Sequence, residues 1–176
     1  MSRRLWIGLA AVLVAAIAVY WFGFRQKTVE ADVEVPVLAA VIGEGEETVG
    51  VSGNGAVVRW LPPPEDPPLP RLPLDEVPKG GKVHGTALEQ VRVLAAVPDA
   101  LRPYVANSFF GESGVDVTLT TGIELRFGDA SQARRKWRAA AAVLADPSVT
   151  ALDYVDLHAP SRPAYGGSEH ELPPAP

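Results

Sequence analysis

The clearest pattern in the chain is an alternation of apolar and polar residues between positions 115 and 127. Apolar side chains occupy every second position of 115–119 and again of 123–127, and Thr120-Thr121-Gly122 separates the two runs. Such alternation is typical of strands that bury one face, and a short glycine-containing turn between them favours antiparallel pairing. The segment therefore predicts a β-hairpin.

Further apolar runs with the length and composition of strands lie on both sides of this hairpin. Gly53-Asn54-Gly55 separates two of them, and both residue types tolerate the positive φ that a tight turn needs. We expect these strands at Val35–Ile42, Thr48–Val51, Ala56–Trp60, Val105–Phe110, Thr150–Leu157 and Ser161–Tyr165. The Gly-, Ser- and Pro-rich residues 166–176 predict a disordered tail.

Two segments show the period of an amphipathic helix. Thr86 and Glu89 have the spacing of a capping box, and the apolar pattern after them stops at Pro98. The second helix is expected to begin at an Asp129 N-cap, with Gln132 three residues on, and to end near Leu144. Its predicted buried stripe consists of Ala133, Trp137, Ala140, Ala141 and Leu144.

The second helix also carries a basic cluster, made of Arg134, Arg135, Lys136 and Arg138. We interpret the cluster as a solvated helix face, because charged residues commonly occupy the side opposite the core. Contact with anionic lipid or with a peptidoglycan precursor is the alternative.

The segment Leu5–Phe24 carries no charge and matches the roughly 20 residues that a helix needs to cross a bilayer. We predict a retained transmembrane helix at 5–24, with 1–4 as a cytoplasmic leader, 25–34 as a connector and the rest outside the cell. The alternative is a signal peptide cleaved after Ala18, which would release the protein.

The segment Leu61–Pro78 holds eight of the chain's 17 prolines, which remove backbone donors and fix φ. We expect it to be an extended crossing between two halves of one domain that spans 35–165. Pro67–Pro70 also fits the P-x-x-P pattern of ligands for proline-binding grooves. A stiff spacer is the commoner use of such a segment.

The composition and the motifs argue against several classes of protein. A net charge of −5 does not suit a nucleic-acid-binding face, and the absence of cysteine removes disulfides, thiolate metal sites and cysteine nucleophiles. Gly111–Gly114 reads as a turn rather than a nucleophile elbow, and Asp153 and Asp156 point to opposite faces of a strand. We therefore expect no catalysis, no cofactor, no metal and no small-molecule substrate.

Several strings, taken in order, resemble the β domain of the bacterial FtsQ/DivIB cell-division proteins. They are Pro36-Val37, Val49–Val57, Leu72-Pro73, Val117–Leu119, Gly122–Gly128, Lys136 and Val155-Asp156-Leu157-His158. His158 stands where the family often has arginine. The connector 25–34 stands where the family places a POTRA domain, and we interpret it as a remnant of that region. The resemblance implies an α+β fold: one transmembrane helix followed by an extracytoplasmic domain with a mixed or antiparallel sheet and two helices.

The resemblance also implies a function in assembly at the cell membrane and the division septum. Family members bind the bitopic proteins FtsB (DivIC) and FtsL by strand addition to the last strands of the β domain, and so link the division ring to septal peptidoglycan synthesis. By position, the partner-binding residues of this chain would be Asp156, Leu157, His158, Ser161, Arg162, Pro163, Ala164 and Tyr165.

An alternative function is a membrane-anchored envelope module that binds a ligand or a polysaccharide. This alternative uses Trp60, Phe109 and Phe110 as a surface patch, and it expects their rings to be exposed. The other interpretation of the Phe109-Phe110 pair is packing in the core and at the edge of a turn.

Overall fold

A computed structural model of the chain describes residues 35–74 and 76–174, and residues 36–176 form one compact unit. The predicted leader, transmembrane helix and connector lie outside the described residues. Among the residues that are described, no helix has both the length and the apolar character needed to cross a membrane.

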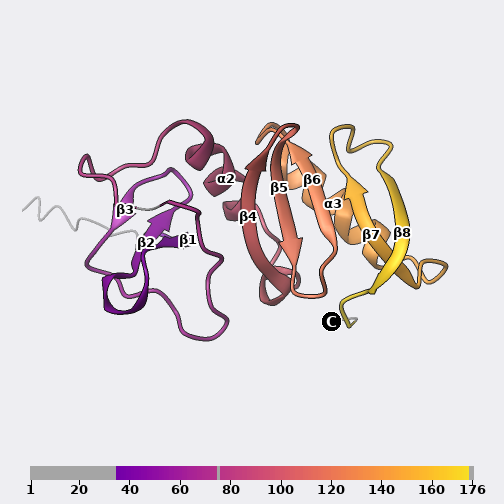
Figure 1. Cartoon of the computed structure of the whole chain (residues 1–176), viewed down its shortest axis with the longest axis horizontal. Coiled ribbons are helices and arrows are strands. Elements are labelled where there is room, and N and C mark those ends of the chain that lie inside the picture. The colour runs from indigo at the N-terminus through magenta and orange to yellow at the C-terminus, as the bar shows by residue number, and fades with distance from the viewer. Residues whose placement is uncertain (1–34, 75, 175–176) are drawn as a thin grey trace, which may run out of the picture. The chain divides into compact units, whose positions relative to one another are not determined.

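A small antiparallel sheet of three strands opens the described part of the chain (Figure 1). Its strands, in spatial order, are β1 (Leu38–Ile42), β2 (Val49–Ser52) and β3 (Val57–Val58), and the 3-10 helix η1 (Gly45–Glu47) lies between the first two. The predicted turn at 53–55 is present, since the Gly55 N–H donates to the Ser52 carbonyl at 2.7 Å. The third strand is shorter than the predicted Ala56–Trp60.

The proline-rich crossing runs alongside β1. The Val41 N–H donates to the Pro70 carbonyl at 3.0 Å, and the Leu72 N–H donates to the Val41 carbonyl at 2.9 Å. Arg71 forms parallel bridges both to Val41 and to Asn107. The segment is extended, as expected, but it also carries main-chain pairing between two groups of strands. Pro70, the last proline of the P-x-x-P pattern, is buried by this pairing.

A second sheet holds five strands in the spatial order β4 (Val105–Gly111), β5 (Gly114–Leu119), β6 (Glu124–Gly128), β7 (Ala151–Asp156) and β8 (Ala164–Glu171). The predicted hairpin is confirmed as the β5–β6 pair, and Gly111–Gly114 is the β4–β5 turn. The β6–β7 pair is parallel and the other pairs are antiparallel, so the sheet is mixed. The predicted α+β domain, with two α-helices among the described residues, is confirmed.

The two α-helices, α2 (Gly85–Ala95) and α3 (Ala133–Leu144), pack on the sheets. Figure 1 shows α3 behind β6 and β7, and the 3-10 helix η2 (Arg102–Tyr104) leads into β4. The Trp137 ring of α3 is fully buried against Phe127, with ring centroids 4.9 Å apart. Its indole N–H donates to the Val93 carbonyl of α2 at 2.8 Å, so one residue ties both helices to the sheet.

The predicted N-caps of both helices are wrong. The first helix begins at Gly85 without a side-chain cap, because the Glu89 carboxylate accepts the Ala130 N–H at 3.0 Å instead of turning back to its own helix. The second begins after Gln132, which has a φ of 53°. Asp129 is turned toward Ser131 and toward an ammonium group farther along α3.

Lys136 is buried, with 3% of its side chain exposed, so the predicted solvated basic cluster loses this member. Its ammonium group donates to the carbonyls of Phe127 (2.8 Å) and Asp129 (3.0 Å) and to the Asp129 carboxylate (2.7 Å). The predicted stripe also shifts, since Lys136 and Val143 are buried while Ala141 and Leu144 are only partly so. Three acceptors therefore hold a charge inside the apolar face of α3.

Candidate partner-binding edge

Strand β8 ends the order of the five-stranded sheet, so its outer edge has no strand beside it among the described residues (Figure 1). The strand runs from Ala164 to Glu171, whereas the sequence predicted a strand at Ser161–Tyr165 and a disordered tail from 166. The tail prediction is therefore wrong for 166–171. An edge strand exposes a row of unpaired N–H and C=O groups, which is a template for pairing with another chain.

An irregularity in the β7–β8 pairing fixes the shape of this edge. The register shifts between Leu152 and Tyr154, and the Asp153 carboxylate accepts the Glu169 N–H at 2.7 Å. Gly167 has a φ of +86°, and a Cβ at this position would collide with the Asp153 carboxylate. Glycine is therefore required here both for the backbone conformation and for the close approach of Asp153.

The loop between β7 and β8 is held at its start by His158. The imidazole Nδ1 lies 2.8 Å from the Asp156 carboxylate and Nε2 lies 3.3 Å from the Ser113 carbonyl in the β4–β5 turn. The ring packs against Gly128, where a Cβ would be within 2.5 Å of Nε2. Both partners of the ring are acceptors, so only the protonated imidazolium donates to both.

The ionisation of this end of the sheet follows from these contacts. The hydrogen bond to Asp156 is the main cause that raises the pKa of His158, and the Ser113 carbonyl adds to it. Burial works to raise the pKa of Asp156, but the His158 main-chain N–H and ring outweigh it, and the pKa is lowered. Burial, followed by the nearby Glu124, raises the pKa of Asp116. Asp156 and His158 therefore favour a charged pair.

The residues predicted to bind a partner occupy three different settings. Leu157 is fully buried in the core, whereas Asp156 is partly exposed and His158 is exposed. The next three, Ser161, Arg162 and Pro163, belong to the loop before β8, where the Arg162 N–H donates to the Ala159 carbonyl at 2.9 Å. Ala164 and Tyr165 are the first residues of the edge strand, and Tyr165 is 47% exposed.

Sequence reasoning missed Gly166–Glu171, the longer part of the edge. Almost all of β8 is exposed on both faces, so it lacks the apolar alternation by which a half-buried strand is found. The weak signal was Leu172, a partly buried apolar residue that packs against the core directly after the acidic run.

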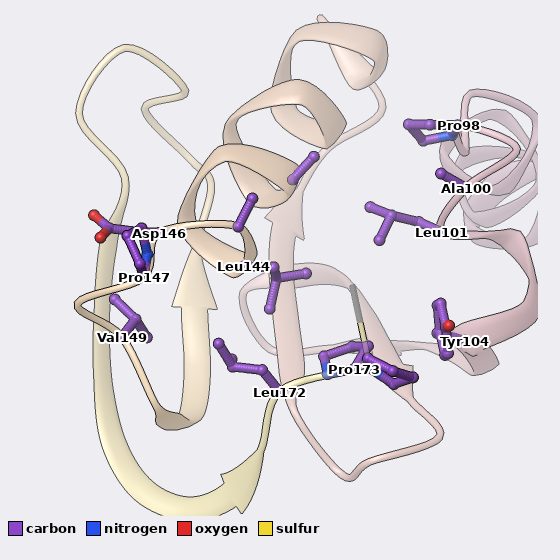
Figure 2. A pocket seen from close by; sticks show the side chains of 13 residues that line it. Pro98, Ala100, Leu101, Tyr104, Leu144, Asp146, Pro147, Val149, Leu172 and Pro173 are labelled. Atoms are coloured by element: carbon purple, nitrogen blue, oxygen red, sulfur yellow. The ribbon is translucent and has the colours of Figure 1, made fainter. Parts of the chain in front are cut away.

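An apolar hollow of about 410 Å³ lies where β8 ends. Figure 2 shows side chains from three parts of the chain around it: Leu101 before η2, Leu144 and Val149 around the end of α3, and Leu172 with Pro173 after β8. The wall that Leu172 and Pro173 form is continuous with the edge strand.

The same end of β8 carries the one group of metal-type ligands found among the described residues, and it fits a structural role. Atoms of Asp153, Glu169 and His170 lie within 4.8 Å of one another. The Asp153 carboxylate already accepts the Glu169 N–H, which accounts for its position. Exposed acidic side chains often gather in this way without an ion.

The fold and the edge together define the class of protein as an α+β domain with a mixed sheet that ends in a long edge strand. The chain belongs to the FtsQ/DivIB family of cell-division proteins: the family model "Cell division protein FtsQ/DivIB, C-terminal" matches residues 40–158. The match therefore begins within β1, includes β2 to β7 and stops at His158. A comparison with curated proteins found no similar sequence.

The family match confirms the resemblance, and the structure confirms the α+β domain. It makes this chain a cell-division protein from a family whose members are in general not enzymes and are typically anchored in the membrane at the septum.

Proposed function

We propose that the chain is a non-enzymatic divisome scaffold whose β8 edge pairs with a strand of a bitopic partner of the FtsB/DivIC or FtsL type. By binding such partners the protein would connect assembly of the division ring to septal peptidoglycan synthesis. The observation that carries the proposal is the outer edge of β8, a strand of eight residues that has no other strand beside it in the described part of the chain.

Two features of the edge support strand addition. The edge is already ordered by its pairing with β7 and by the contact with Asp153. Binding a partner therefore costs little conformational entropy in β8. Tyr165 offers a half-exposed ring at the start of the strand, and aromatic residues often dominate the energy of interfaces. The proposed contact set is Asp156, His158, Ser161, Arg162, Pro163, Ala164 and Tyr165, with Leu157 supporting it from the core.

The chain is also proposed to span the membrane once at 5–24, with its N-terminus in the cytoplasm and its domain outside, at the septum. A fluorescent fusion tests this arrangement, because the proposal requires enrichment at midcell in dividing cells. A uniform signal around the cell envelope would contradict it.

The partner proposal is tested by removing the edge and, separately, by blocking it. Deletion of 159–176 is expected to abolish co-purification of FtsB/DivIC- and FtsL-type partners, while the family-matched part keeps its far-ultraviolet circular dichroism. Ser168 has no register partner on β7, because it lies where the β7–β8 pairing shifts between Gly166 and His170, so Ser168→Pro should weaken capture without unfolding the domain. Undiminished co-purification with both variants would refute the proposal, and Ser168→Ala is the matched control.

The envelope-module alternative has one observation in its favour: Trp60, Phe109 and Phe110 are 64%, 38% and 45% exposed. The packing interpretation of the two phenylalanines is therefore wrong. Phe109 pairs with Asp116 and Phe110 with Val115, so the two rings point to opposite faces of the sheet. The pair thus does not form one binding surface, and the strand edge is the better-supported site.

A further inference from the structure

Another apolar hollow, of about 440 Å³, lies where the described domain begins, and no residue of β8 lines it. Val37, in its lining, is 76% exposed, and Trp60, which directly precedes a lining residue, is 64% exposed. These are the two most exposed of the large apolar side chains in the part of the chain that the structure describes. The surface therefore leaves apolar groups in contact with water. The rest of its apolar lining comes from the start of β1 and from the proline-rich crossing, and includes Pro36, Leu38, Leu61, Pro62 and Leu69.

This hollow carries little net charge. Asp99 and Arg102 are the charged residues in its lining, and their side chains pair with each other at 3.4 Å. In the sequence that flanks the crossing, Arg59 is offset by Glu65 and Asp66, and all three are exposed. A partner that is recognised by its charge is therefore disfavoured, whereas an apolar surface fits.

The position of the hollow in the chain points to the membrane as its occupant. The proposed span ends at residue 24, and a connector of residues 25–34 reaches at most roughly 35 Å when fully extended. Pro36 and Val37 follow this connector almost at once, so the tether keeps the hollow close to the bilayer surface. Tethering raises the effective concentration of lipid at the hollow to about the millimolar range, so a weak apolar contact is enough.

We propose that this hollow, together with Val37 and Trp60, is a lipid-contact surface that holds the domain against the outer face of the membrane. The inference rests on the proposed membrane span and adds an orientation of the domain to it. The Trp60 ring combines a large apolar body with an N–H donor, and this combination favours the layer between acyl chains and headgroups. Val37 and the proline-rich crossing supply the rest of the apolar contact.

The test uses the full chain reconstituted in phosphatidylcholine vesicles, with and without bromine atoms on the acyl chains, because bromine quenches an indole only at close range. Trp6→Phe and Trp21→Phe leave Trp60 and the fully buried Trp137, so quenching by the lipid reports on Trp60. Trp60→Phe gives the contribution of Trp137 alone. We expect brominated lipid to quench the Trp60 emission, and Val37→Asp to remove most of this quenching while the Trp137 emission is unchanged.

Two variants serve as matched controls. Phe110→Asp adds the same charge at another exposed apolar residue and should leave the quenching unchanged. Tyr165→Trp combined with Trp60→Phe moves the exposed indole to β8, the last strand of the five-stranded sheet, and should give no quenching.

The outcomes separate this inference from the proposed span. A chain that stays in the vesicles after alkaline carbonate but shows no quenching of Trp60 would overturn the inference and leave the span standing. Release by carbonate would refute the span and the inference with it. Equal quenching at Trp60 and at residue 165 would overturn the inference, because the lipid contact would not be specific to the hollow. A shift of the Trp60 emission to shorter wavelength without quenching would also overturn it, since protein, a second copy included, would then cover the surface.

Discussion

Lys136→Met tests the most unexpected feature of the core, the buried ammonium group at the start of α3. The substitution keeps the length and the apolar stem of the side chain, so it removes the charge and the donors while leaving little void. It leaves the Phe127 carbonyl without the donor that lies 2.8 Å away, and the Asp129 carboxylate without the one at 2.7 Å.

The size of the effect follows from which acceptors are buried. Phe127 is fully buried, so its carbonyl loses a partner that water does not replace, at a cost of about 1–3 kcal/mol. The Asp129 side chain is 67% exposed, so solvent screens its ion pair and the pair adds at most about 1 kcal/mol. We expect Lys136→Met to lower the free energy of unfolding by about 1–4 kcal/mol in total.

The pH dependence isolates the ionic part of this loss. The hydrogen bond from Lys136 is the main cause that lowers the pKa of Asp129 from 3.8 to about 2. A carboxyl whose pKa is lower in the folded state stabilises the fold above the unfolded value, and loses that contribution as pH falls from 3.8 toward about 2. The difference between wild type and Lys136→Met should therefore be largest at neutral pH and should shrink in acid.

The assay is urea unfolding followed by tryptophan fluorescence, with Trp6→Phe and Trp21→Phe in every chain compared. Trp137 is the neighbour of Lys136 and reports on α3 directly. Arg135→Met is the matched control, because Arg135 is exposed on the same helix, and it should cost little. A Lys136→Met chain as stable as this control would refute the assignment of a buried, fully bonded ammonium group.

Three further predictions concern the packing around the edge. His158→Gln should cost at most about 1 kcal/mol, and only at low pH: the folded pKa of His158 is raised, so its stabilisation is complete below 6.5 and is lost as pH rises through the folded value, as unfolding at several pH values would show. Gly167→Ala should lower the free energy of local opening of β8 by about 1–3 kcal/mol, measured as faster amide hydrogen exchange in that strand. Unchanged exchange would argue against the positive φ and the close Asp153 contact at this position. Trp137→Phe should cost about 1–3 kcal/mol in urea unfolding, since it leaves the buried Val93 carbonyl without its donor.

The sequence predicts the fold best where burial differs between the two faces of an element. The β5–β6 hairpin was found because Val115, Val117 and Leu119 are buried on one side, and α3 was found from the spacing of Ala133, Trp137 and Ala140. These elements are defined by their own residues. Their periodicity therefore survives without knowledge of the neighbours.

Prediction from the sequence failed where a side chain forms hydrogen bonds with a distant part of the chain. The Glu89 carboxylate had the spacing of a capping box, but its partner is the Ala130 N–H, 41 residues away. Lys136 had the pattern of a solvated basic face, but it reaches the carbonyls at the end of β6. Local spacing states what a side chain is able to do, and long-range packing decides between the possibilities.

The edge strand β8 lacks an apolar pattern and depends on contacts with a distant strand. The sequence therefore predicted only its first two residues, Ala164 and Tyr165. β8 pairs with one neighbour and buries little, so hydrogen bonds to β7, rather than an apolar pattern, define it. A strand left open for a partner has this property by construction, because the alternation that would reveal it is completed by the partner's side chains. Residues 166–171, first interpreted as part of a disordered tail, then form the longer part of the proposed interface.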